Sequence, residues 1–203
     1  MKDSCVILCT GGIGSGKSVV VRLFRELGVP SYDCDRAALS LYDRDPRLCA
    51  AVSDAVGGGV LDAAGRIDRG ALAGRIFADA SLLAAVEALV HPALIRDFEA
   101  WKERQESALV VIESAILLEK PLFAGLMDVT VAVTAPEAVR IARVMRRDGL
   151  TEAQVRQRMA AQWSDAARAA HADYELENDN RSALLPAVLQ IIEKTKTRWK
   201  RQI

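Results

Sequence analysis

The sequence lacks the charge excess and the metal-ligand clusters on which several classes of protein depend. Its 27 Lys and Arg residues are matched by 27 Asp and Glu residues. This balance removes the simplest argument for a nucleic-acid binder, because such proteins need a large positive field. Only two histidines are present, and no pair among Cys5, Cys9, Cys34 and Cys49 has the C-x-x-C spacing of a zinc or redox site. We therefore expect free thiols in a reducing compartment.

Long apolar segments are also missing. The run from Cys5 to Cys9 is too short to span a bilayer, and it leads into glycines rather than a cleavage site. A chain of 203 residues that is 51% hydrophobic and 27% charged has the composition of an ordinary globular protein, so disordered and fibrous classes are excluded. We expect a cytoplasmic protein with no membrane partner and no nucleic-acid partner. A small anionic ligand is compatible with this composition, because it needs only local positive charge.

The sequence does contain an alternation of buried strands and amphipathic helices. Ser4–Thr10 is a continuous apolar run, typical of a parallel strand that is buried on both faces. Lys17–Leu27 carries apolar residues on one helical face and ends at Gly28, and Ser182–Trp199 has a similar helical pattern. Four more strands are predicted, at Val29–Asp33, Leu109–Glu113, Asp128–Val133 and Asp173–Leu176.

Two long helical stretches interrupt this alternation. Residues 35–107 are predicted to be almost entirely helical, with breaks at Asp45-Pro46 and His91-Pro92 and a glycine loop at 57–59. Residues 136–171 are helical and rich in arginine. Such insertions form lids and substrate covers in α/β enzymes. The sequence therefore predicts an α/β fold, with a parallel five-stranded sheet, helices on both faces, a helical substrate-binding insertion and a helical lid.

The strongest motif matches the phosphate-binding loop G-x-x-x-x-G-K-[ST] of P-loop nucleoside triphosphatases. It lies between a buried strand and an amphipathic helix, as such a loop must. Glycines let the backbone turn several N–H groups around an anion, and the helix N-terminus adds partial positive charge. Lys17 can reach the β- and γ-phosphates, and the Ser18 hydroxyl can ligate Mg²⁺. The residues predicted to bind nucleotide here are Gly12, Ile13, Gly14, Ser15, Gly16, Lys17, Ser18 and Val19.

A phosphate loop leaves three classes open: a small-molecule kinase, a GTPase switch and an ATPase motor. A guanine-reading N-K-x-D stretch is absent, and Asp54-Ala55-Val56-Gly57 matches D-x-x-G only where a predicted helix ends. Leu109–Glu113 ends in an acid, as a Walker B strand does, which makes Glu113 a candidate to contact Mg²⁺ through water. However, 203 residues leave little room for motor apparatus. The helical insertions and the arginines favour a kinase of a small phosphate acceptor.

Such a kinase needs a carboxylate near the γ-phosphate to orient or deprotonate the acceptor hydroxyl. Asp33 and Asp35 follow the second predicted strand, and a strand end beside the phosphate loop is where this group belongs. Asp35 also suits a helix N-cap, and spacing alone leaves open whether Asp33 is catalytic. His91, at a predicted helix start, suits either a cap or core position or contact with substrate.

An arginine cluster falls within the second helical stretch. Its members have i, i+3 and i+4 neighbours on one helix. Such arginines often form a solvated face, but a phosphate loop in the same chain favours a phosphate clamp. The cluster consists of Arg140, Arg143, Arg146 and Arg147.

In their order and spacing, the motifs resemble the dephospho-coenzyme A kinase family from about residue 5 to residue 195. The resemblance covers three groups of residues. The first is Cys9–Ser18, Asp33-Cys34-Asp35, Gly65–Arg69 and Ile76-Phe77. The second is His91-Pro92, Glu113–Glu119, Arg143, Arg147–Leu150 and Arg158-x-x-x-Gln162. The third is Ala172-Asp173-Tyr174 followed by Asn178.

The resemblance implies ATP-dependent phosphorylation of the ribose 3′-hydroxyl of dephospho-coenzyme A, the last step of coenzyme A synthesis, with Mg²⁺ as cofactor. The partners of the protein would be these two small molecules, and the chain would be a monomer or a weak homo-oligomer. Asp33 would be the base and, with Lys17, catalytic. Arg143 and Arg147 would close over the phosphates, and Asn178 would lie near the adenine of ATP. The acceptor would be bound by Asp35, His91 and Glu119.

The resemblance also implies one P-loop kinase domain of three parts. The core would comprise about 1–34, 108–135 and 172–203, the coenzyme-binding insertion about 35–107, and the lid about 136–171. Another nucleoside or nucleotide kinase, or a non-enzymatic nucleotide-binding switch, remains an alternative.

Four residues depart from the family pattern. Val19 replaces a threonine, but Ser18 keeps the metal-ligating hydroxyl. Ala115 replaces a proline, which could loosen a loop beside the substrate. Glu175 replaces an apolar strand residue, so the fifth strand is expected to be short or at an edge. Asn180 replaces a glycine and can adopt positive φ.

Overall fold

A five-stranded parallel sheet forms the centre of the computed structural model, which describes residues 4–200. The strand order is β2-β3-β1-β4-β5, so the first and third strands along the sequence pair at its centre. The predicted α/β fold with a parallel sheet is confirmed. The strands are β1 (Cys5–Thr10), β2 (Ser31–Asp33), β3 (Leu109–Glu113), β4 (Val129–Thr134) and β5 (Tyr174–Glu177).

The central strands are apolar because both of their faces are covered. Every residue of β1 and β4 is buried. Cys9 is in register with Glu113, and Glu113 with Asp33. The carboxyl ends of β1, β2 and β3 therefore meet at one edge of the sheet.

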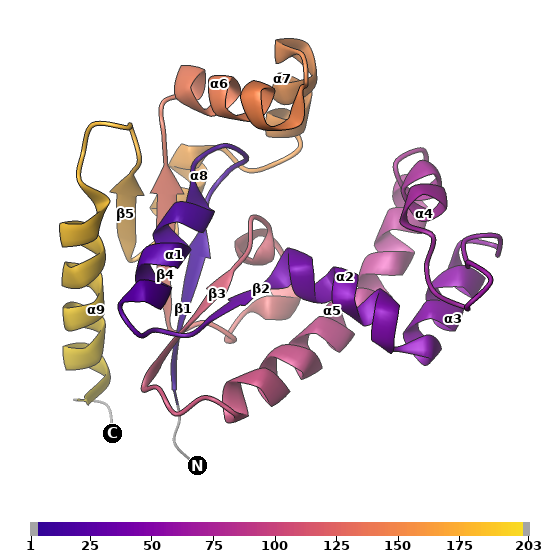
Figure 1. The fold of residues 1–203 in the computed structure, drawn as a ribbon, viewed down its shortest axis with the longest axis horizontal. Helices are drawn as coiled ribbons and strands as arrows, with labels where there is room; N and C mark the ends of the chain where they lie inside the picture. The colour runs from indigo at the N-terminus through magenta and orange to yellow at the C-terminus, as the bar shows by residue number, and fades with distance from the viewer. Residues whose placement is uncertain (1–3, 201–203) are drawn as a thin grey trace. The chain divides into compact units, whose positions relative to one another are not determined.

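Helices α1 (Lys17–Glu26) and α9 (Leu184–Lys200) contact each other and cover one face of this sheet. Helix α8 (Asp165–Ala170) packs against β4 and lies behind that strand in Figure 1. The core under α1 and α9 includes Ile7, Val20, Phe24, Val131, Val188 and Ile191. The final helix places Leu185 on its exposed side, although the sequence pattern assigns this residue to the apolar face.

Helices α6 (Glu137–Asp148) and α7 (Glu152–Ala160) follow β4 and contact each other. They enclose a small apolar cluster of Ile141, Val144 and Val155. A Thr151–Gln154 capping box begins α7, which satisfies two backbone donors at its start. The arginine-rich segment is therefore helical, as predicted, and its helices are short because a cap or turn separates each from the next.

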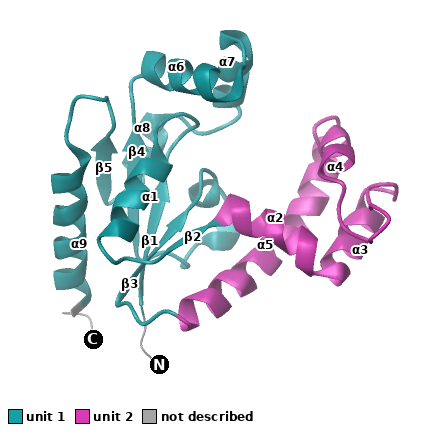
Figure 2. Cartoon of the chain, in the orientation of Figure 1, with its two compact units in different colours: residues 1–33, 105–203 teal, residues 34–104 magenta. Residues whose placement is uncertain are grey.

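Residues 34–104 form a second compact unit (Figure 2). The long helix α5 contacts each of the other three helices of this unit. Asp45 caps α3 by accepting hydrogen bonds from two backbone N–H groups, so the predicted break at Asp45-Pro46 is confirmed. The helices are α2 (Cys34–Arg44), α3 (Pro46–Ala55), α4 (Arg69–Ile76) and α5 (Ala80–Glu103).

The predicted break at His91-Pro92 is wrong, because α5 continues through Pro92. A proline inside a helix removes one backbone hydrogen bond and costs about 3 kcal/mol. Packing offsets this cost, since apolar side chains on both sides of the proline are buried within one helix. These side chains are Val86, Val90, Ala93, Leu94 and Phe98.

Two expectations drawn from family departures are confirmed. β5 is an edge strand of four residues, and the exposed Glu175 accepts a hydrogen bond from the Thr134 hydroxyl at 3.0 Å. Asn180 has a φ of +67°. A polar residue with a short side chain tolerates that conformation, so the loop after β5 keeps its turn without glycine.

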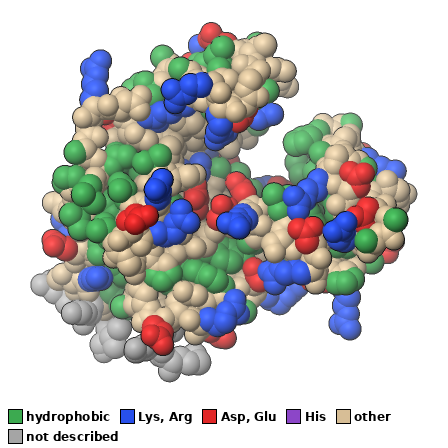
Figure 3. Space-filling model, viewed as in Figure 1, with side chains coloured by type: hydrophobic (Ala, Val, Ile, Leu, Met, Phe, Trp, Pro, Cys, Tyr) green, Lys and Arg blue, Asp and Glu red, His purple; other side chains and the backbone are tan. Residues whose placement is uncertain are grey.

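The surface mixes both signs of charge. In the view of Figure 3, basic and acidic side chains are interspersed and form no single large basic patch on that face. Across the described residues, no helix is long and apolar enough to cross a membrane.

Candidate active site

The loop Gly11–Gly16 connects the buried end of β1 to the first residue of α1. Gly16 lies directly before this helix with φ +91°, and Gly14 has φ +79°. L-residues with a Cβ rarely adopt these conformations. A Cβ at Gly16 would also lie 2.1 Å from Asn178 Nδ2. The glycines of the motif are therefore required both by backbone geometry and by the close approach of another strand end.

Side chains from later in the chain bind the carbonyl groups of this loop. Arg140 Nε donates to the Ile13 carbonyl at 2.9 Å. Arg143 Nη1 donates to the Gly14 and Ser15 carbonyls, each at 3.1 Å. Asn178 Nδ2 donates to the Ser15 carbonyl at 3.0 Å.

This arrangement sets the direction of the loop's N–H groups. In a trans peptide, the C=O and the following N–H point in opposite directions. Because the Ile13 and Ser15 carbonyls point to the arginines and to Asn178, the N–H groups of Gly14 and Gly16 are turned to the other side. Together with the N-terminus of α1, they form a concave set of donors suited to phosphate.

Lys17 and Ser18 begin α1 and lie beside the end of β3. Lys17 Nζ donates to the Gly11 carbonyl at 2.8 Å, and the Ser18 hydroxyl donates to Glu113 Oε1 at 2.8 Å. Glu113 is the last residue of β3, and Asp33 stands opposite it at the end of β2. The structure thus brings together the predicted Lys17, Ser18, Glu113 and Asp33.

Of the two arginines predicted to close over phosphates, only Arg143 contacts the loop. Its Nη2 also donates to Asn178 Oδ1 at 3.1 Å and to Asn180 Oδ1 at 2.5 Å. Arg147 is exposed and pairs with Asp148 through two hydrogen bonds of 2.7 and 2.9 Å. These hydrogen bonds lower the pKa of the Asp148 carboxyl, which keeps the pair charged.

Glu119 lies in a short 3₁₀ helix, η1 (Leu117–Glu119), and forms a buried ion pair. Its Oε1 is 2.6 Å from Arg168 Nη2 and accepts a hydrogen bond from the Trp163 backbone N–H at 3.2 Å. Burial lowers the pKa of the Arg168 guanidinium, and the charge of Glu119 opposes that shift. Glu119 is therefore connected to the segment between α7 and α8 and to α8 itself, a link that the sequence did not predict.

Asp35 and His91 both belong to the second unit. Asp35 lies in the first turn of α2, where a carboxylate favours the positive end of the helix dipole. The helix begins at Cys34, so a cap at Asp35 is wrong and Asp33 occupies the position before the helix. His91 lies inside α5 rather than at a helix start.

Two loop contacts were missed by sequence reasoning. Gln162 Oε1 accepts a hydrogen bond from the Ile13 backbone N–H at 2.9 Å, and Arg140 holds the carbonyl of the same residue. The only available signal was the arginine-rich composition and the Arg158-x-x-x-Gln162 motif. Neither says which backbone group these side chains would meet.

Among residues 4–200, the structure holds no cluster of three or more His, Cys, Asp or Glu side chains that could bind a metal by itself. All four cysteines are free and buried in the structure. A divalent ion here would have to share its coordination between one or two side chains, water and a nucleotide, as Mg²⁺ commonly does.

Known proteins resemble this chain along most of its length. A family model described as dephospho-CoA kinase matches residues 5–183. The dephospho-CoA kinase of Porphyromonas gingivalis is 40% identical over 190 residues, which is 93% of each chain. The dephospho-CoA kinase of Bacteroides fragilis is 35% identical over 184 residues, covering 90% of this chain and 89% of the relative.

Solved structures share the fold over nearly the whole chain. The TT1252 protein of Thermus thermophilus has 34% sequence identity and a TM-score of 0.78, covering 96% of this chain and 97% of its own. The dephospho-CoA kinase of Campylobacter jejuni, at 21% identity, superposes with a TM-score of 0.67 over 94% of this chain and 96% of its own. Since the family model spans all five strands and the Porphyromonas gingivalis relative aligns over 93% of its length, the chain belongs to the dephospho-CoA kinase family.

Proposed function

We propose that the chain transfers the γ-phosphoryl group of ATP to the ribose 3′-hydroxyl of dephospho-coenzyme A. The products are coenzyme A and ADP, and the reaction is the final step of coenzyme A biosynthesis. The observation that carries this proposal is the meeting of the phosphate loop with the two strand-end acids, Asp33 and Glu113, in a chain of this family.

The phosphate loop binds the triphosphate of ATP in this proposal. The N–H groups of Gly14 and Gly16 and the start of α1 hold phosphate oxygens. Lys17 supplies a full positive charge where negative charge develops in the transition state. In the structure its ammonium contacts the Gly11 carbonyl at 2.8 Å, so Lys17 exchanges this neutral partner for phosphate when ATP binds.

The acceptor hydroxyl is activated by Asp33. Its carboxylate accepts the proton of the 3′-hydroxyl as the new P–O bond forms and the bond to ADP breaks. Since phosphoryl transfer has a loose transition state, holding the hydroxyl in line matters at least as much as removing its proton. Asp35, His91 and Glu119 are proposed to contact the acceptor. For Glu119 this requires a role beside its ion pair with Arg168.

Mg²⁺ fits the residues at the loop. The Ser18 hydroxyl and the Glu113 carboxylate offer oxygen donors 2.8 Å apart, and Mg²⁺ prefers a small number of such ligands together with water and phosphate oxygens. Ser18 would hold the ion directly and Glu113 through water. When bound, the ion neutralises charge on the β- and γ-phosphates.

The arginine-rich helices complete the nucleotide site in this proposal. Asn178 holds the loop from its carbonyl side and lies near the adenine of ATP in this proposal. Arg143, which also contacts the loop, closes over the phosphates. Arg147 has to exchange Asp148 for a phosphate in order to bind ATP. We propose that residues 136–171 act as a lid, that about 35–107 bind the coenzyme, and that the enzyme works in the cytoplasm as a monomer or weak homo-oligomer.

The test is an assay of ADP release with a panel of acceptors in the presence of Mg²⁺ and ATP. Dephospho-coenzyme A should give turnover far above adenosine, AMP, shikimate and a water-only blank. Mass spectrometry should find one added phosphate at the 3′-position. Faster turnover with another nucleoside or nucleotide would assign a different kinase activity. Nucleotide binding with no turnover on any acceptor would favour a switch.

A further inference from the structure

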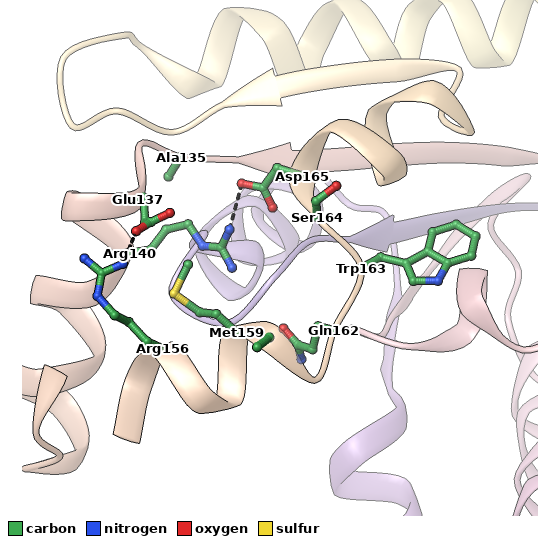
Figure 4. A pocket seen from close by; sticks show the side chains of 10 residues that line it. Ala135, Glu137, Arg140, Arg156, Met159, Gln162, Trp163, Ser164 and Asp165 are labelled. Carbon is green, nitrogen blue, oxygen red and sulfur yellow. Dashed lines mark hydrogen bonds and ion pairs between the residues drawn. The ribbon is translucent and has the colours of Figure 1, made fainter. Parts of the chain in front are cut away.

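Two buried arginines share one carboxylate beside the phosphate loop. Arg140 Nη1 lies 3.0 Å from Asp165 Oδ2, and Arg168 Nη1 lies 3.8 Å from Asp165 Oδ1. The side chains of Arg140 and Arg168 are only 7% and 1% exposed. Figure 4 shows Arg140 reaching toward Asp165 along the wall of a cavity of about 510 Å³.

Within this cluster, Arg140 contacts the phosphate loop at Gly12 and Ile13. Arg140 Nε holds the Ile13 carbonyl, and its Nη2 occupies space that a Cβ on Gly12 would need, 2.1 Å away. The peptide between Ile13 and Gly14 is therefore fixed from its carbonyl side. Since the N–H of Gly14 points the opposite way, the direction of this phosphate donor depends on where Arg140 is held.

Arg168 contacts the segment that follows Glu113. Arg168 Nη2 pairs with Glu119 at 2.6 Å and donates to the Ala115 carbonyl at 3.4 Å, and Nη1 donates to the Trp163 carbonyl. Ala115 is two residues beyond Glu113, where β3 ends. The carboxylate of Asp165 thus lies between Arg140, which contacts the phosphate loop, and Arg168, which contacts the segment that follows β3.

Asp165 is the acid that lies close to both arginines of this cluster. Arg140, Arg168, Asp165 and Glu119 carry two positive and two negative charges, so the cluster is neutral when all four are charged. A buried guanidinium that loses one of its carboxylates keeps its desolvation penalty and turns to other partners. A planar guanidinium is also oriented by its partners, because its donors are fixed in one plane.

We propose that Asp165 is a positioning residue for phosphoryl transfer. It holds Arg140 on the Ile13 carbonyl and Arg168 on Glu119, and it thereby fixes the phosphate loop relative to the segment that follows Glu113. Asp165 contacts neither nucleotide nor acceptor in this scheme. The inference rests on the proposed function, since the loop is the part of the site that binds ATP.

The test compares two variants that disturb the same link in different ways. Asp165→Asn keeps the size of the side chain and removes its charge. Arg140→Lys keeps a positive charge for Asp165, but a single ammonium cannot take the place of both Nε on Ile13 and Nη1 on Asp165. The matched control is Glu137→Gln, which removes the exposed ion pair between Glu137 and Arg156 that Figure 4 also shows.

The main readout is the dissociation constant of a non-hydrolysable ATP analogue with Mg²⁺, measured by calorimetry without acceptor. We expect Asp165→Asn and Arg140→Lys each to weaken analogue binding about tenfold, because each disturbs a charged hydrogen bond. The double variant should have a dissociation constant no higher than that of whichever single variant binds the analogue less tightly, because both substitutions act through the Ile13 carbonyl. Glu137→Gln should stay within twofold of the wild type.

Thermal unfolding of each variant separates positioning from folding. Weak analogue binding in variants that melt near the wild-type temperature supports the proposal. Unchanged binding in Arg140→Lys or in folded Asp165→Asn overturns it, and so does additivity in the double variant. Because the analogue assay uses no acceptor, absence of turnover with dephospho-coenzyme A in the wild type would refute the proposed function without affecting this test.

Discussion

Asn178 Nδ2 lies 3.0 Å from the Ser15 carbonyl oxygen, although 163 residues separate them. The Asn178 side chain is buried, and its backbone N–H donates to the Thr134 carbonyl at 2.8 Å. The segment just beyond β5 is therefore bound both to the neighbouring strand and to the phosphate loop. This contact leaves no room for a side chain at Gly16, and it makes the loop sensitive to a single methyl group.

Gly16→Ala should weaken nucleotide binding strongly. The new Cβ would lie 2.1 Å from Asn178 Nδ2, and the residue would have to keep a φ of +91°. We expect at least a tenfold rise in the dissociation constant of an ATP analogue, because a hydrogen bond to the loop has to break. Calorimetry on the purified variant measures it.

The matched control is Gly28→Ala. Gly28 also has positive φ, +79°, but has open space around it. This variant should lose about 1 kcal/mol of unfolding free energy through backbone strain alone. Its affinity for the analogue should match the wild type. Equal effects of the two substitutions on affinity would contradict a role for the Asn178 contact.

Lys17→Ala should lower kcat by roughly 10²-fold or more, because such electrostatic contacts in a closed site supply several kcal/mol to the transition state. The fold should stay intact, because losing the hydrogen bond from the ammonium to the Gly11 carbonyl leaves the buried core unchanged. Steady-state kinetics with both substrates checks it. Arg22→Ala on the same helix removes an exposed charge and should leave kcat unchanged. Near-normal turnover of Lys17→Ala would refute the assignment of the phosphate loop.

Asp33→Asn should lose roughly 10²–10⁴-fold in kcat with dephospho-coenzyme A, because the amide cannot accept the hydroxyl proton. ATP-analogue binding should be retained. Asp35→Asn, which changes a carboxylate in the first turn of α2, should mainly raise the KM for the acceptor or lower stability. Kinetics of both variants beside analogue titration measures these effects.

The outcomes of the Asp33 and Asp35 comparison are distinct. If Asp35→Asn loses turnover while Asp33→Asn keeps it, the two roles are reversed. If neither substitution lowers kcat, the catalytic base lies elsewhere.

Residues 136–171 should become protected from hydrogen exchange when an ATP analogue and the acceptor are both bound. Arg147 is exposed and Arg143 contacts the loop, so closure over phosphates would order this segment. Mass spectrometry of peptides from α6 and α7 measures the change, and peptides from β1, which is buried already, serve as the internal control. Equal exchange with and without ligands would indicate that the arginines form only a solvated face.

The buried thiols should make stability fall at alkaline pH. Burial raises the pKa of Cys9 from 9.0 to about 12, and burial, with Asp128 adding to it, raises the pKa of Cys5 to about 12. The folded state therefore holds these protons while the unfolded chain releases them, so stability is lost as pH rises from about 9 toward about 12. Urea unfolding of the wild type and Cys9→Ala at pH 8 and pH 10.5 tests this. The wild type should lose more stability over that interval, and equal losses would contradict the prediction.

The core and the phosphate loop could be predicted from the sequence because their signals are local. A continuous apolar run such as β1 can be satisfied only where both faces are covered, and glycines at Gly14 and Gly16 allow the backbone to adopt positive φ. Lys17 and Ser18 follow from that loop by fixed spacing. Asp33 and Glu113 were placed correctly because parallel strands bring their carboxyl ends to one edge.

Tertiary structure decided which partner each charged side chain meets. Arg140 and Arg143 bind the carbonyl side of the loop, Arg147 pairs with Asp148, and Glu119 is buried against Arg168. Neighbouring arginines on one helix look alike in sequence. They differ because a helix turns by about 100° per residue, so only the packing of α6 determines which face meets the loop. Tertiary packing also explains why α5 continues through Pro92, because long-range burial outweighs a local helix-breaking signal.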